Sequence, residues 1–194
     1  AACAKAGAEL VPFSTLVDGS LPKVDGLFIG GGFPECCIGN LSANATLRAE
    51  IKTFIEAGGP AYAECGGLMY LSRSLTWQGV SGEMVGILPG DTEVLPRPVG
   101  RGYMQIRVDA NHPWPRFRAQ AGAVLNVHEF HHSRFNATTN DWSYAFSVER
   151  GHGLDGVRDG IHVHNLLATY AHQRHVQANL WVDAFVDFVR THRP

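Results

Sequence analysis

One cysteine lies in a setting that could make it a nucleophile. Cys65 follows a short apolar run, residues 61–64, and precedes two glycines and a second apolar segment. This pattern predicts a buried strand that turns sharply into a helix at Cys65, so that the thiol stands above the edge of a sheet. The helix start would favour the thiolate, and the N–H of Gly66 could stabilise an oxyanion. Free cysteines are also common core residues, so simple packing is the alternative.

Glycines and histidines elsewhere in the chain could complete such a site. Residues 30–32 are three glycines after another apolar run, a pattern that by itself predicts a tight turn. Eight of the ten histidines fall between His128 and His175. Histidine is the most frequent general base in enzymes. A cluster of histidines could hold a metal ion, but we expect no metal site in this one.

The elements that would position these residues alternate between strand and helix over the first 75 residues. Such alternation predicts an α/β sheet with parallel strands. The middle of the chain favours an antiparallel extension of the same domain, and the end returns to a buried strand and a helix with Asn179 as its N-cap. Strands are predicted at residues 9–13, 25–29, 61–64, 103–108 and 161–170, and helices at residues 46–57, 68–75 and 181–189.

Composition and charge exclude several functional classes. A length of 194 residues with 45% hydrophobic residues fits one globular domain, residues 1–194. With 16 Lys and Arg against 18 Asp and Glu, the chain offers no basic surface for nucleic acid or an anionic membrane. We find no signal peptide and no apolar run of the roughly 18 residues that a membrane span needs. Four cysteines without a C-x-x-C pair favour a cytoplasmic location.

Four sequence runs together resemble one family, in order and over nearly the whole chain. They are residues 30–35 (GGGFPE), 62–71 (YAECGGLMYL), 128–133 (HEFHHS) and 165–172 (NLLATYAH). The chain resembles the C-terminal class I, or triad-type, glutamine amidotransferase domain of the cobyrinic acid a,c-diamide synthases. The resemblance implies a flavodoxin-like, mostly parallel sheet with helices on both faces and an antiparallel extension. It also implies that the first strand of that sheet lies outside this chain, as does an N-terminal ATP-dependent synthetase domain.

The resemblance assigns roles to individual residues. Cys65 would attack the side-chain amide of glutamine, forming a γ-glutamyl thioester and releasing ammonia, with His172 as the general base. Gly31, Gly32 and Gly66 would form the oxyanion and substrate-binding loops, with Gly31 favoured as the second donor. Ammonia would pass to the synthetase domain of the same full-length chain, which would bind ATP and Mg²⁺ and amidate a tetrapyrrole carboxylate. The glutaminase domain itself would need no cofactor.

The chain departs from the family pattern around the histidine. Many class I amidotransferases have Glu two residues after the catalytic histidine, to orient its ring. This chain has Arg174 there, so the third triad member is undefined. His175 could replace it, or a Cys–His dyad could suffice. His128, Glu129 and His131 belong to a family motif, and they could line the route to the synthetase domain or form only local hydrogen bonds.

Other functions remain open from the sequence. The altered residues after His172 also fit a non-catalytic docking module, which would keep the fold and bind a partner. The elbow at Cys65 would equally serve a Cys-dependent hydrolase that acts on another amide. Loss of the first strand could leave a sheet edge that pairs with another chain, so a homodimer is a further option. The family includes enzymes that act on cobyrinic or hydrogenobyrinic acid, nickel-sirohydrochlorin and sirohaem-like rings.

Overall fold

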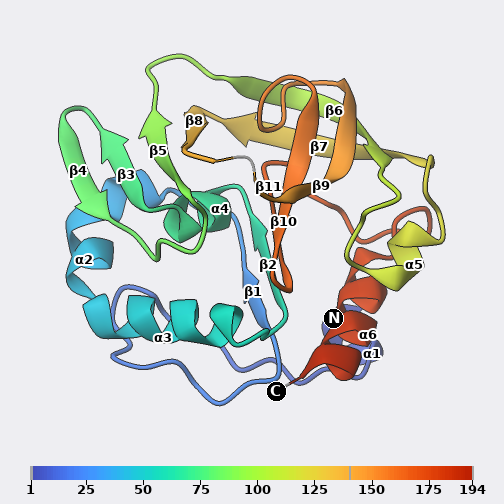
Figure 1. Ribbon diagram of the computed structural model, residues 1–194, viewed down its shortest axis with the longest axis horizontal. Coiled ribbons are helices and arrows are strands. Elements are labelled where there is room, and N and C mark those ends of the chain that lie inside the picture. The colour runs from blue at the N-terminus through green and yellow to red at the C-terminus, as the bar shows by residue number, and fades with distance from the viewer. Residues whose placement is uncertain (1, 140, 194) are drawn as a thin grey trace.

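A seven-stranded mixed sheet forms the centre of the fold. The computed structural model describes residues 2–139 and 141–193 (Figure 1). Neighbouring strands lie in the order β1-β2-β11-β10-β9-β6-β7. The first three are parallel, and every later pair is antiparallel. The strands are β1 (Leu27–Ile29), β2 (Ala61–Glu64), β6 (Gly100–Val108), β7 (Val124–His131), β9 (Ser143–Arg150), β10 (Arg158–Val163) and β11 (Leu166–Thr169).

A smaller sheet and the helices surround this centre. The smaller sheet has the order β4-β3-β5-β8. Its strands are β3 (Ser74–Trp77), β4 (Val80–Glu83), β5 (Gly90–Val94) and β8 (Ser133–Ala137). The helices are α1 (Ala2–Lys5), α2 (Ile38–Ala43), α3 (Ala45–Glu56), α4 (Gly66–Leu71), α5 (Pro115–Arg118) and α6 (Trp181–His192), with a 3-10 turn at Pro34–Cys37. Within the described residues, no helix has the length and apolar character needed to cross a bilayer.

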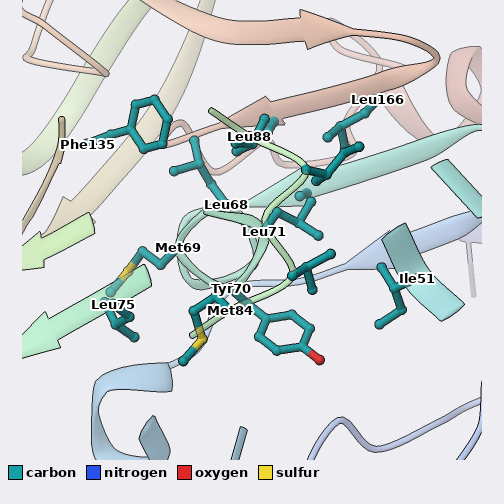
Figure 2. Close-up of a cluster of buried hydrophobic side chains, with 14 of the residues drawn as sticks. Ile51, Leu68, Met69, Tyr70, Leu71, Leu75, Met84, Leu88, Phe135 and Leu166 are labelled. Atoms are coloured by element: carbon teal, nitrogen blue, oxygen red, sulfur yellow. The ribbon is translucent and has the colours of Figure 1, made fainter. Parts of the chain in front are cut away.

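The parallel strands separate two hydrophobic cores, because successive side chains of a strand point to opposite faces. Ala61 and Ala63 of β2 belong to the core that contains α3 and α4, whereas Tyr62 belongs to the core that contains α6. Figure 1 shows these helices on opposite sides of the sheet. Figure 2 shows Leu68, Met69 and other side chains of α4 inside the first core. Helices therefore cover both faces, as predicted.

The helix predicted at residues 46–57 is confirmed as α3. Leu47, Ile51 and Ile55 repeat at a spacing of four residues and are fully buried. This spacing places them on one face of a helix, against the sheet. The helix ends at Glu56, and Gly58 follows with φ +91°, a conformation that glycine adopts at little cost.

The antiparallel part of the sheet is larger than the sequence predicted. Residues 161–170, predicted as a single strand, form a hairpin instead. β10 ends at Val163, β11 begins at Leu166, and His164 turns between them with φ +51°. β11 is buried throughout, whereas only residues 159–161 of β10 are buried, and the turn falls on the polar residues His164 and Asn165. Only the pairs β1–β2 and β2–β11 of the large sheet are parallel.

The strand predicted at residues 9–13 is wrong. This segment is irregular, and Leu10 is 67% exposed. A hollow of about 670 Å³ is lined by this segment, by the edge strand β1 and by α6. Without a neighbouring strand, the backbone of this segment has no sheet partner, so its β-type sequence does not produce a strand. That the first strand of the family's sheet lies outside this chain stays a prediction.

Two element boundaries also differ from the predictions. The helix predicted at residues 68–75 ends at Leu71, and the chain then enters β3 at Ser74. Asn179 does not cap α6, whose N-cap residue is Leu180. The Asn179 side chain instead donates to the Gln173 side-chain oxygen, 3.2 Å away, and so ties the start of α6 to the loop after His172.

The buried carboxylate of Asp159 holds the hairpin in shape. Oδ2 accepts hydrogen bonds from the Thr169 hydroxyl at 2.7 Å and the Ala171 N–H at 2.9 Å. Oδ1 accepts from the N–H groups of Tyr170 at 3.0 Å and Gly160 at 2.8 Å. Burial raises the pKa of Asp159, while these hydrogen bonds act in the opposite direction. β10 thereby fixes the segment that leads to His172.

We expect Asp159→Asn to lower the free energy of unfolding by about 2–3 kcal/mol, because the new amide group would face N–H donors. Urea unfolding measures the change. Asp187→Asn is the control, since Asp187 pairs with Arg116 and Arg190 at the surface and is 46% exposed. That control should lose no more than about 1 kcal/mol. Equal losses in the two variants would contradict a structural role for the Asp159 network.

Candidate active site

Cys65 occupies the predicted elbow between β2 and α4. Its backbone angles are φ +47° and ψ −102°, a left-handed conformation that is rare for a residue other than glycine. The Cys65 N–H donates to the Thr169 carbonyl at 2.7 Å, which anchors the elbow to β11. The thiol donates to the Phe130 carbonyl of β7 at 3.6 Å. Three separate strands therefore meet at this residue.

The two glycines after Cys65 allow backbone to approach backbone. A Cβ atom on Gly66 would lie 2.6–2.9 Å from backbone atoms of Gly32. A Cβ atom on Gly67 would fall on the carbonyl oxygen of Ile29. Since real Cβ atoms do not come this close, any side chain here would push α4 away from the loop after β1. The structure thus brings Gly32 and Gly66 together beside Cys65.

His172 lies next to this elbow, although 107 residues separate it from Cys65 in the sequence. It follows β11 and forms an isolated backbone bridge with His128 of β7, with N–H to carbonyl distances of 3.2 and 2.7 Å. A Cβ atom on Gly31 would lie 2.7 Å from Cε1 of the His172 ring. Interaction with the Cys65 thiol and the Glu64 carboxylate raises the pKa of His172 to about 10, against the lowering effect of burial.

Glu64, which was not predicted from the sequence, also lies beside the His172 ring. Its Oε2 lies 3.7 Å from Nδ1 of His172. The signal that could have found it is a single acidic residue at the end of the otherwise apolar strand β2, all of which is buried. Such a residue needs a polar partner. Only the folded chain shows that this partner includes the histidine ring.

His175 does not join the Cys65–His172 pair. Its Nε2 lies 3.5 Å from the Asp183 carboxylate of α6, so it faces another partner. His128 is exposed, and its ring centre is 6.2 Å from that of His172. The sequence predicted either His175 as a replacement for the third triad member or a Cys–His dyad. In the structure, the acidic residue beside the His172 ring is Glu64, and His175 lies against Asp183 instead.

Glu129 and His131 form a separate buried network behind the site. Glu129 accepts hydrogen bonds from the N–H groups of His152 at 2.8 Å and Gly153 at 2.9 Å. Burial would raise the pKa of Glu129, but His131 and these two N–H groups together hold it below its usual range. The His131 ring stacks on Tyr170 with ring centres 3.9 Å apart. These contacts favour the local hydrogen-bonding interpretation of the motif.

The remaining histidines are dispersed. Nδ1 of His162 contacts the Ser143 hydroxyl at 3.1 Å, and Nδ1 of His132 contacts the Leu95 carbonyl at 3.3 Å. In the part of the chain that the structure describes, no group of three or more His, Cys, Asp or Glu residues is arranged to hold a metal ion. Among the described residues, the histidines that do approach each other are the pairs His128–His172 and His131–His152, with ring centres 6.2 and 6.1 Å apart.

Comparison with known proteins agrees with this geometry. Residues 2–179 match the sequence pattern of the CobB/CobQ-like glutamine amidotransferase domain. The chain belongs to this family. It is 44% identical over 184 residues to the cobyrinate a,c-diamide synthase of Magnetococcus marinus, covering 95% of this chain and 38% of that protein. It is 46% identical over 165 residues to the enzyme of the same name from Archaeoglobus fulgidus, covering 85% of this chain and 35% of that protein.

Solved structures show the same fold at low sequence identity. PurLQS from Thermotoga maritima aligns with a TM-score of 0.62 at 14% identity, covering 91% of this chain and 82% of that one. A protein of Thermoplasma acidophilum assigned as part of GMP synthase aligns with a TM-score of 0.59 at 16% identity, covering 91% and 79%. The α/β class I amidotransferase fold is therefore confirmed, with a mixed rather than mostly parallel sheet. The amidotransferase domain spans little more than a third of the curated relatives it matches.

The strained elbow predicts that Gly gives a more stable protein than Ala at position 65, the reverse of the order expected within a helix. Cys65→Gly should be more stable than Cys65→Ala by about 1 kcal/mol, because only glycine adopts the left-handed backbone without strain. Urea unfolding compares the two variants. At exposed Thr53 in α3 the ordinary order should hold, with Ala more stable than Gly by about 1 kcal/mol. If Ala were also the more stable residue at position 65, the elbow would not be strained.

The approach of Gly31 to His172 predicts a change in titration. In Gly31→Ala the new methyl group would displace the ring from Cys65 and Glu64, and the His172 pKa should fall from about 10 toward 6.5. NMR titration of the histidine ring protons measures it. Gly32→Ala is the matched variant, because a Cβ atom there meets nothing within 4 Å. The same fall in both variants would show that loss of a glycine, rather than contact with His172, is the cause.

Proposed function

We propose that this domain hydrolyses glutamine and supplies ammonia for amidation. The observation that carries the proposal is the pairing of Cys65, on its strained elbow, with the ring of His172. A nucleophile held next to a base is the arrangement that acyl transfer through a covalent intermediate requires. The family membership of the chain supports glutamine as the substrate.

The proposed reaction proceeds in two steps. His172 takes the proton of the Cys65 thiol, and the sulfur attacks the side-chain amide carbon of glutamine. His172 then delivers that proton to the leaving nitrogen, so that the C–N bond breaks, ammonia departs and a γ-glutamyl thioester remains. His172 then takes a proton from water, whose oxygen attacks the thioester. Glutamate leaves, and the proton returns to the thiol. We assign stabilisation of the oxyanion to the N–H of Gly66 and to a second donor on the loop with Gly31 and Gly32, with Gly31 favoured.

The ammonia would be used outside this domain. We propose that a synthetase domain of the same full-length chain binds ATP and Mg²⁺ and amidates carboxylate side chains of cobyrinic acid or a related tetrapyrrole. The names of the curated relatives and the share of their length that this chain covers support this division of labour. The four cysteines are all free, which agrees with the proposed cytoplasmic location.

We expect Cys65→Ser in the full-length protein to abolish glutamine hydrolysis and glutamine-dependent amidation of cobyrinic acid, and to leave amidation from ammonium salts unchanged. The reason is that release of ammonia from glutamine uses the Cys65 sulfur, whereas amidation from ammonium salts does not. Glutamate release and amide formation, measured separately in the presence of ATP and Mg²⁺, test this. If both nitrogen sources failed together, the division of labour would be wrong.

A glutamine-mimicking alkylator, diazo-oxo-norleucine, separates the alternatives in the same preparation. A single adduct on Cys65, blocked by excess glutamine, supports a glutamine site. If a generic alkylator reached Cys65 and the glutamine mimic did not, the docking module or a hydrolase for another amide would replace the proposal. Peptide mapping by mass spectrometry locates the adduct.

A further inference from the structure

The carboxylate of Glu64 is held on both of its oxygens. Oε2 lies 3.7 Å from Nδ1 of His172, and the Glu64 side chain is only 9% exposed. Oε1 accepts a hydrogen bond from the Tyr62 hydroxyl at 2.6 Å and from the Gln173 N–H at 3.0 Å. One oxygen therefore fixes the side chain, while the other is directed to the histidine ring.

The groups that hold Glu64 are themselves fixed. The Gln173 side chain donates to the Tyr62 hydroxyl at 2.9 Å and accepts from Asn179 at 3.2 Å. The Tyr62 ring packs among the rings of Trp114 and Trp181, with centres 5.1 and 5.2 Å away. Burial, followed by the negative charge of Glu64, raises the pKa of Tyr62 well above its usual value, so the hydroxyl stays a donor.

We propose that Glu64 is the positioning residue that orients the His172 ring, in the role that class I amidotransferases usually give to a glutamate after the histidine. The inference rests on the proposed glutaminase function and extends it. Its distinctive feature is that the acidic residue immediately precedes the nucleophile in the chain. Nucleophile and acidic residue are thus adjacent along β2, and the histidine reaches both of them from the end of β11.

The alternatives in the same region have other contacts. Arg174, two residues after His172, is exposed. His175 lies against Asp183. The titratable groups that face the His172 ring are Cys65 and Glu64 from the end of β2 and His128 from β7. Of these, only Glu64 is an acid that can hold a proton on Nδ1 and leave Nε2 free for the thiol.

The test is Glu64→Gln in the full-length protein, assayed with glutamine, cobyrinic acid, ATP and Mg²⁺. The kcat for glutamine hydrolysis should fall by about 100-fold with little change in KM for glutamine, because the group acts through His172 and not on the substrate. The alkaline limb of the pH profile should move to lower pH, since the Glu64 charge raises the pKa of His172. Ammonium-dependent amidation should be unchanged.

Asp183→Asn is the matched control, because it removes the carboxylate beside His175 and should leave both activities unchanged. Glu64→Gln with wild-type kcat would overturn the inference. Absence of glutamine hydrolysis in the wild-type protein would instead overturn the proposed function.

If Glu64→Gln also lost ammonium-dependent activity, ¹⁵N NMR of the His172 ring in the wild-type protein would decide. The spectra are recorded above the His172 pKa of about 10, where the ring is neutral. A ring that then carries its remaining proton on Nδ1 supports the inference, and one that carries it on Nε2 contradicts it.

Discussion

The backbone of Cys65 adopts a left-handed conformation, which turns the chain sharply from β2 into α4. The rest of the site depends on that turn. Such a conformation costs on the order of 1–3 kcal/mol and persists only where the surroundings determine it. Here the N–H of Cys65 is bonded to Thr169 of the neighbouring strand, and α4 packs on the loop after β1 through two glycines. The absence of side chains on Gly66 and Gly67 lets α4 start this close to the loop after β1.

The parallel order of β2 and β11 explains how distant residues meet. Glu64 lies opposite Thr169 in the register of these strands, so Cys65 and the segment after Thr169 emerge at the same edge of the sheet. The antiparallel strands then support this edge from outside. Asp159 of β10 holds the segment before His172, and the backbone of His128 in β7 pairs with that of His172. Parallel strands thus bring the pair together, and antiparallel strands fix its position.

Local patterns predicted much of this arrangement. The run around Cys65 has the composition of an elbow, and the spacing of Leu47, Ile51 and Ile55 defines α3, because both patterns depend on neighbours in the chain. The turn at His164 was missed because two short strands joined by a two-residue turn cover the same length as one long strand, and His164 and Asn165 were not treated as turn residues. The strand predicted at residues 9–13 is wrong for a different reason, because a β-type sequence forms a strand only beside a partner strand. Glu64 was not predicted because its contact with the His172 ring joins residues that are 108 positions apart in the sequence.

Burial of a carboxylate at the end of a strand costs free energy, which other contacts must offset. Removal of such a charge from water costs several kcal/mol unless hydrogen bonds compensate for it. For Glu64 the compensation comes from the Tyr62 hydroxyl and the Gln173 N–H, and the Tyr62 ring is held in the aromatic core around α6. The charge that faces His172 is therefore maintained by packing on the opposite side of the sheet from α4. Through Tyr62, the core that stabilises the fold also fixes the acidic group beside Cys65 and His172.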